Sequence, residues 1–139
     1  MNYKQTFITI SPDSPTEASI IPASKGDKPT IHALQYQLLT EHPYTFNGEE
    51  LLFEVHVRRL GLSPEEVAER RDELWAELFS KDHACLRAST LAKKYGWGFH
   101  FDEAGHIALY GAETDAYQTF SSGEQADIKV LSGMRSKRA

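Results

Sequence analysis

The sequence contains little cysteine and no long hydrophobic run. Its only cysteine, Cys85, excludes an internal disulfide framework and a zinc site built from several cysteines. No apolar run approaches the roughly 20 residues that a membrane-spanning helix needs. Residues 1–5 lead directly into a strand-like segment and lack the pattern of a signal peptide. We therefore expect a cytoplasmic protein with no membrane partner.

The sequence also lacks an excess of positive charge. Its 15 Lys and Arg residues stand against 20 Asp and Glu residues, which gives a net charge of −5. That balance argues against general attraction to nucleic acid. The acidic excess falls entirely within residues 1–80, which carry a net charge of −6, whereas residues 81–139 carry +1. At 139 residues, the composition predicts one globular domain over 1–139 with a short basic tail at 135–139.

Recognisable catalytic and metal-binding motifs are scarce. None of the six histidines has the H-x-x-x-H, H-E-x-x-H or H-x-H spacing of a metal site, so we expect no metal and no cofactor. Cys85 is the only available thiol nucleophile, and His83 or His100 is the corresponding candidate base. A buried, inert cysteine is the more common situation. A cysteine-dependent enzyme is therefore the alternative interpretation, and a protein without catalytic activity is favoured.

The spacing of hydrophobic residues predicts an α+β fold. We expect an antiparallel sheet of about four strands, formed by an N-terminal strand, a central hairpin and a C-terminal strand. Three main helices are expected to pack on one face of this sheet. The expected elements are a strand at 6–10, helices at 30–42, 48–60 and 63–80, a hairpin at 98–110, a short helix at 113–120 and a strand at 128–131.

One helix prediction has an alternative. Residues 51–57 alternate between apolar and polar positions, which is also typical of a strand. Asn47 and Glu50 form a capping pair before this segment, and Gly61 is a typical residue after a helix end. Because both ends carry helix signals, we favour a helix. The next helix has the stronger signal, since Ser63-Pro64-Glu65-Glu66 combines an N-cap, an N1 proline and a capping-box glutamate.

Residues 85–100 hold most of the candidate binding residues. Ser89 is placed to cap a short helix that ends at Gly96, and Arg87 next to its start would attract an anion. Gly96 and Gly98 on either side of Trp97 would allow a ligand to approach the backbone closely. Two more cations lie in a loop before the first helix and in the C-terminal tail. The predicted ligand-binding set is Lys25, Arg87, Lys94, Tyr95, Trp97 and Arg135.

These residues lead to our first hypothesis, a non-enzymatic module that binds a small anionic ligand or an acidic protein segment. The cations would orient the ligand, and the aromatic rings would supply apolar walls. A structural protein–protein interaction module, including a homo-oligomer, is a further alternative. The binding hypothesis requires that folding bring these distant residues together.

Segments along nearly the whole chain resemble a known family. They are Thr6-Phe7-Ile8, residues 22–28, Tyr44, residues 85–89, residues 94–98, Ala108-Leu109-Tyr110 and residues 134–138. The chain resembles a family of small, mainly bacterial proteins classified only as a domain of unknown function. This resemblance implies no activity, substrate or cofactor.

Overall fold

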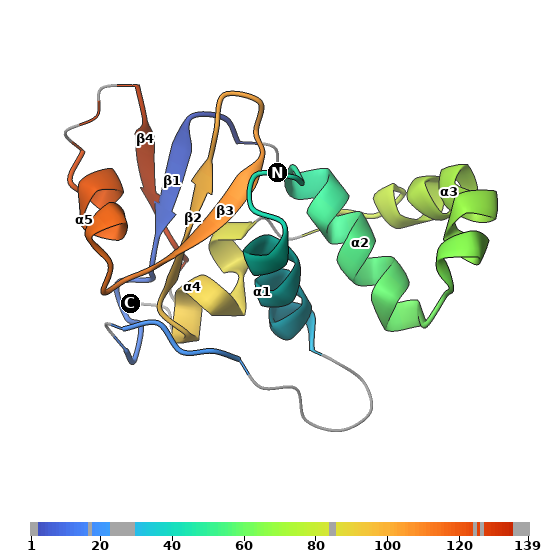
Figure 1. The fold of residues 1–139 in the computed structure, drawn as a ribbon, viewed down its shortest axis with the longest axis horizontal. Helices are drawn as coiled ribbons and strands as arrows, with labels where there is room; N and C mark the ends of the chain where they lie inside the picture. Colours follow the sequence, from blue (N-terminus) through green and yellow to red (C-terminus); the bar gives the residue numbers. More distant parts are fainter. Residues whose placement is uncertain are drawn as a thin grey trace.

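The computed structural model describes residues 3–16, 18–22, 30–83, 86–123, 125 and 127–134. Within them the chain forms a four-stranded sheet and several helices, as Figure 1 shows. The α+β class predicted from the sequence is confirmed. The elements are β1 (Thr6–Thr9), α1 (Ile31–Glu41), α2 (Gly48–Leu60), α3 (Pro64–Phe79), the short 3₁₀ helix η1 (Leu86–Ala88), α4 (Thr90–Lys94), β2 (Trp97–Phe101), β3 (Ile107–Gly111), α5 (Asp115–Ser121) and β4 (Lys129–Ser132).

The sheet has the strand order β3-β2-β1-β4 and is mixed. The pairs β1–β2 and β2–β3 are antiparallel, as predicted, but β4 runs parallel to β1. The prediction of a wholly antiparallel sheet is therefore wrong at its last strand. Because β3 and β4 run in the same direction, the chain must cross over the sheet between them, and α5 lies in that connection.

Helices cover both faces of the sheet. Phe99 and Phe101 of β2 belong to a core that includes residues of α1, α2 and α4. On the other face, Phe7 of β1 packs with Tyr117 and Phe120 of α5. The prediction that the three main helices share one face is wrong in part, because α3 packs with α2 in a separate cluster.

The alternating pattern of α2 reflects its position between two apolar clusters. Leu51 and Val55 face the sheet core, whereas Phe53 and Val57 pack with Leu74 and other residues of α3. Both sets are almost fully buried. The segment is a helix with two buried sides, which explains why its sequence also resembles a strand. Figure 1 shows α2 between α1 and α3.

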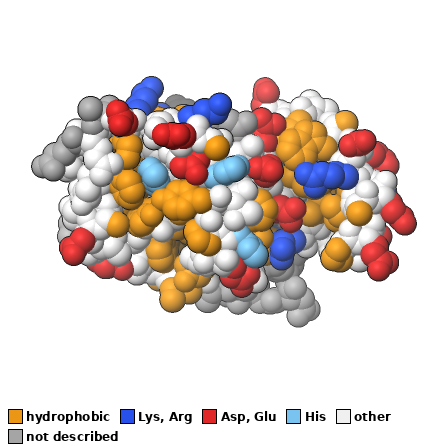
Figure 2. Space-filling model, turned by 45° about the horizontal axis from the view of Figure 1, so that its top comes forward, with side chains coloured by type: hydrophobic (Ala, Val, Ile, Leu, Met, Phe, Trp, Pro, Cys, Tyr) orange, Lys and Arg blue, Asp and Glu red, His pale blue; other side chains and the backbone are white. Residues whose placement is uncertain are grey.

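Of the 13 acidic residues in residues 1–80, three lie on α2 and six lie on α3. Figure 1 shows α3 at the end of the molecule furthest from β4, and Figure 2 shows acidic side chains around hydrophobic ones at that end. The backbone departs from helical geometry at Arg70 (φ −112°, ψ 16°). The guanidinium of Arg71 lies 4.9 Å from the centre of the Phe53 ring, so it covers part of the α2–α3 cluster. No helix within the described part of the chain is long and apolar enough to cross a membrane.

Candidate functional site

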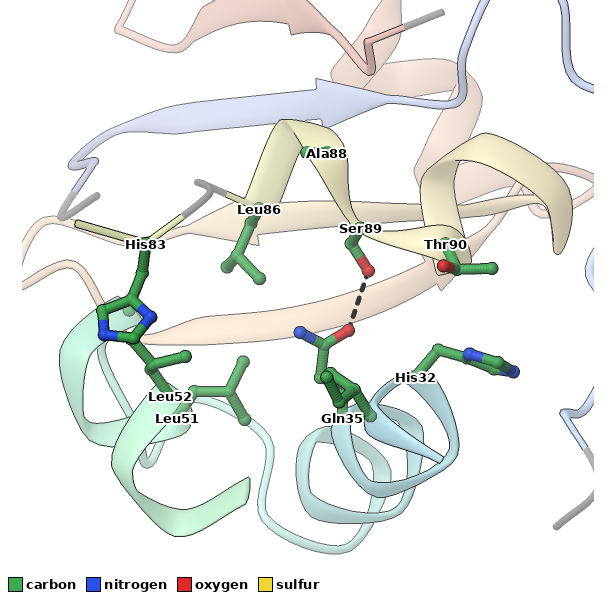
Figure 3. Close-up of a pocket in the computed structure, with 11 residues that line it drawn as sticks. His32, Gln35, Leu51, Leu52, His83, Leu86, Ala88, Ser89 and Thr90 are labelled. Atoms are coloured by element: carbon green, nitrogen blue, oxygen red, sulfur yellow. Dashed lines mark hydrogen bonds between the residues drawn. The ribbon is translucent and has the colours of Figure 1, made fainter. Parts of the chain in front are cut away.

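A cavity of about 310 Å³ lies between α1, the start of α2 and the segment η1–α4. We call it the α1–α4 cavity; Figure 3 shows its residues. It lies where the sheet core meets the α2–α3 cluster, because Leu51 belongs to the first and Leu52 packs against the second. Its lining combines aliphatic and uncharged polar side chains. The lining residues are Ile31, His32, Gln35, Gly48, Leu51, Leu52, His83, Leu86, Ala88, Ser89 and Thr90.

Helix caps fix the starts of α1 and α4, the two helices that form opposite walls of this cavity. The Thr30 hydroxyl accepts a hydrogen bond from the Ala33 backbone N–H and so begins α1, the helix that carries Gln35. The Ser89 hydroxyl accepts from the Leu91 backbone N–H and begins α4. The Ser89 cap predicted from the sequence is confirmed.

A hydrogen bond crosses the cavity between the two sides. The Ser89 hydroxyl donates to the Gln35 side-chain oxygen, with an O···O distance of 2.8 Å. In Figure 3 the Gln35 amide oxygen is directed at Ser89, and its nitrogen lies on the side of His83 and Leu86. Ser89 is only 9% exposed. The bond therefore fixes the orientation of the Gln35 amide.

Two histidines lie at opposite ends of the cavity (Figure 3). The Nε2 atom of His83 is 2.6 Å from the Leu78 carbonyl oxygen at the end of α3. The His32 ring stacks on Tyr95, with 4.9 Å between ring centres, and burial lowers the pKa of His32 from its ordinary value. Because a lowered pKa disfavours the charged form, we expect the His32 ring to be neutral at neutral pH.

Of the described members of the predicted ligand-binding set, Tyr95 contacts the cavity-lining His32, whereas Arg87, Lys94 and Trp97 do not line the cavity. The Arg87 side chain donates from Nε to the Ser132 carbonyl oxygen at 2.7 Å, next to the end of β4. Lys94 is exposed in the last turn of α4. Trp97 donates from its indole nitrogen to the Ile20 carbonyl oxygen at 2.8 Å and packs against Tyr36 of α1. The hydrogen bonds of Arg87 and Trp97 lead to different segments of the chain, and neither residue lines the cavity.

Atoms of the protein itself fill the space beside the two glycines that flank Trp97. A Cβ atom at Gly96, whose φ is +74°, would collide with the Ala18 carbonyl. A Cβ atom at Gly98 would lie 2.7 Å from the Phe7 ring and 2.8 Å from the Tyr117 ring. The close approach predicted for a ligand is therefore made by neighbouring segments of the chain.

Three predicted site residues, Lys25, Cys85 and Arg135, lie outside the described residues. The cysteine hypothesis and the complete cationic set therefore stay predictions. No group of three or more His, Cys, Asp or Glu side chains suited to a metal ion occurs in the part of the chain that the structure describes.

His100 belongs to a different cluster, on the α5 face of the sheet. Its Nδ1 atom is 2.8 Å from the Tyr44 hydroxyl, which is also 2.7 Å from the Tyr110 hydroxyl. Its ring stacks on Phe120 at 4.2 Å, and its buried Nε2 atom has no hydrogen-bond partner among the described residues. Burial lowers the pKa of His100, while the nearby Asp102 carboxylate opposes this effect. Burial and the bond to Tyr110 raise the pKa of Tyr44. We assign this buried cluster a packing role.

Sequence reasoning missed Gln35 as a site residue. It lies one position after Leu34 and three before Leu38, so it borders the buried side of α1. A polar residue at the margin of an apolar stripe occurs in most amphipathic helices, so this position gave no signal for a cavity. Its partner Ser89 was recognised only as a cap.

The chain is thus an α+β protein with helices on both faces of a mixed sheet and a cavity of uncharged lining. It belongs to the family described as a family of unknown function (DUF6157), whose model matches residues 1–139. The resemblance to a family of unknown function is therefore confirmed. No curated protein and no solved structure matches the chain.

Proposed function

We propose that the protein is a binding module that holds a small organic molecule in the α1–α4 cavity. The observation that carries this proposal is the combination of a hollow of about 310 Å³ with a fixed polar pair, Gln35 and Ser89, inside it. Small-molecule sites are concave, mostly apolar and supplied with a few oriented polar groups. Leu51, Leu52 and Leu86 supply the apolar surface.

This proposal retains the predicted function, a binding module, but places the binding site in the α1–α4 cavity instead of at the predicted cationic residues. The predicted anionic ligand and acidic protein partner depended on Arg87, Lys94 and residues outside the described ranges. Arg87 donates to a backbone carbonyl instead. The contacts of the described residues therefore favour small-molecule binding in the α1–α4 cavity over anion binding at the predicted cationic site.

An NMR titration tests the proposal. Benzamide, uracil, benzoate and inorganic phosphate are added separately to isotope-labelled protein, and side-chain amide and methyl signals are followed. We expect at least one compound to shift the signals of Gln35 and of the cavity leucines. The same compound should raise the melting temperature, because a ligand that binds the native state stabilises it.

A pair of matched variants locates the effect. Ala88→Leu adds bulk at the cavity wall, whereas Ala76→Leu adds the same bulk at an exposed position of α3. Filling the cavity should abolish the signal shifts, and the α3 variant should retain them. The proposal is wrong if no compound shifts the cavity signals, or if the shifts persist unchanged in folded Ala88→Leu.

A further inference from the structure

The first feature that identifies the ligand is the absence of charge in the cavity. None of its described lining residues is Lys, Arg, Asp or Glu. Moving an ion out of water without an opposite charge is strongly unfavourable. The lowered pKa of His32 keeps that ring from supplying a positive charge at neutral pH. An uncharged ligand therefore suits this lining better than a phosphate or a carboxylate.

The second feature is an oriented hydrogen-bond donor. Because the Ser89 hydroxyl accepts from the Leu91 N–H, its own proton is available for the Gln35 oxygen. That oxygen is then engaged, and the Gln35 nitrogen keeps two N–H donors on the side of His83 and Leu86 (Figure 3). A ligand carbonyl oxygen is the natural acceptor for them.

The third feature is an oriented acceptor. A carbonyl oxygen can only accept, so the His83 Nε2 atom carries the proton and donates to Leu78. The other nitrogen, Nδ1, is an acceptor whenever it carries no proton. Figure 3 shows one ring nitrogen of His83 on the side that faces Leu86 and Gln35. A ligand N–H group would complement this atom.

We infer that the α1–α4 cavity selects an uncharged amide, primary or cyclic, over a carboxylate of the same shape. An amide combines a carbonyl acceptor for Gln35 with an N–H donor for His83, and its hydrocarbon part contacts Leu51, Leu52 and Leu86. This inference rests on the proposed binding function and adds its ligand class. It makes Gln35 the residue that determines specificity, with Ser89 as the residue that positions it.

The test compares benzamide with benzoate, which have the same ring and differ in charge and in N–H donors. Dissociation constants are measured by NMR titration of the full chain. We expect benzamide to bind about tenfold more tightly than benzoate. The benzoate carboxylate would have no Lys or Arg partner in the cavity lining, and it has no N–H group to donate to His83. Gln35→Glu should weaken benzamide binding about tenfold, because it replaces the donors with a carboxylate.

Control variants separate specificity from general charge and from folding. Gln37→Glu makes the same change at an exposed position of α1 and should leave the binding of benzamide unchanged. Gln35→Met removes the donors at similar size and should weaken benzamide binding even if the glutamate variant fails to fold.

The outcomes distinguish the two proposals. Benzoate binding as tightly as benzamide, with both in the cavity, overturns the amide inference and leaves the binding function intact. Unchanged benzamide affinity in folded Gln35→Glu or Gln35→Met also overturns the inference. Failure of every probe to shift the cavity signals overturns the binding function and the inference together.

Discussion

Gly98 illustrates how single residues in the 85–100 segment serve packing. It lies in β2, and the rings of Phe7 and Tyr117 occupy the space that a side chain would need. Arg87 and Trp97 are also used internally, because each donates to a backbone carbonyl of a distant segment. Residue type alone cannot separate these uses from ligand binding, since the partners are 45 and 77 positions away in the sequence.

The Gly98→Ala variant should be less stable than the wild type by about 1–3 kcal/mol, the usual range for an overpacked core. The free energy of unfolding from urea denaturation measures this change. Gly61→Ala is the control, since its φ of +74° makes a side chain strained although nothing lies within 4 Å of the added Cβ. Its cost of about 1–2 kcal/mol comes from backbone strain alone, which Gly98→Ala lacks because Gly98 has no left-handed φ. A Gly98→Ala protein as stable as the wild type would contradict the packing role.

Stability should fall as the pH is lowered from 7 toward 5, in part because of His100 and His32. Burial lowers the pKa of both groups in the folded state. Below the unfolded pKa of about 6.5, the unfolded chain therefore binds protons that the folded chain does not, and the unfolded state is favoured. Melting temperatures across this range measure the effect. His100→Gln should flatten the profile, and a slope identical to that of the wild type would contradict it.

At the scale of helices and strands, local sequence signals predicted most elements. They failed where contacts between distant parts of the chain determine strand direction or which sides of a helix are buried. The caps at Asn47 and Ser63 identified α2 and α3, and both capping boxes are present. The direction of β4 was missed because nothing within residues 128–131 encodes the strand beside it. It follows instead from the crossover through α5. Likewise, the alternation in 51–57 could not show that α2 has two packed sides.

Ser63→Ala should lower the stability of the protein by about 1 kcal/mol, because the Ser63 hydroxyl accepts from the Glu66 N–H at the start of α3. Ser63→Gly should cost only a few tenths of a kcal/mol, since glycine is well tolerated at this position. Chemical denaturation of the two variants tests the cap. Equal stability of Ser63→Ala and the wild type would show that this capping box contributes nothing.

At the scale of the whole molecule, the acidic helix α3 and the lining of the cavity are separate. Six acidic side chains lie on α3, whereas the cavity lies between α1, the start of α2 and the segment η1–α4, and none of its described lining residues is Lys, Arg, Asp or Glu. The charge distribution along the sequence showed an acidic region within residues 1–80 but did not predict the cavity. The cavity depends on how α1, α2 and α4 meet, and only its caps have a local signal. The acidic partner and the homo-oligomer stay predictions.

Apolar side chains are also exposed elsewhere and offer competing sites for a small aromatic probe. Ile21 is 68% exposed and Leu60 is 53% exposed, and neither lines the cavity. A binding curve alone therefore does not locate the ligand. Direct proximity between the probe and the cavity leucines is needed to do so.

The most direct measurement is an intermolecular NOE spectrum of the wild-type protein with benzamide. The account predicts contacts from the benzamide ring protons to the methyl groups of Leu51, Leu52 and Leu86. Contacts to Ile21 or Leu60 with none to these three leucines would contradict it.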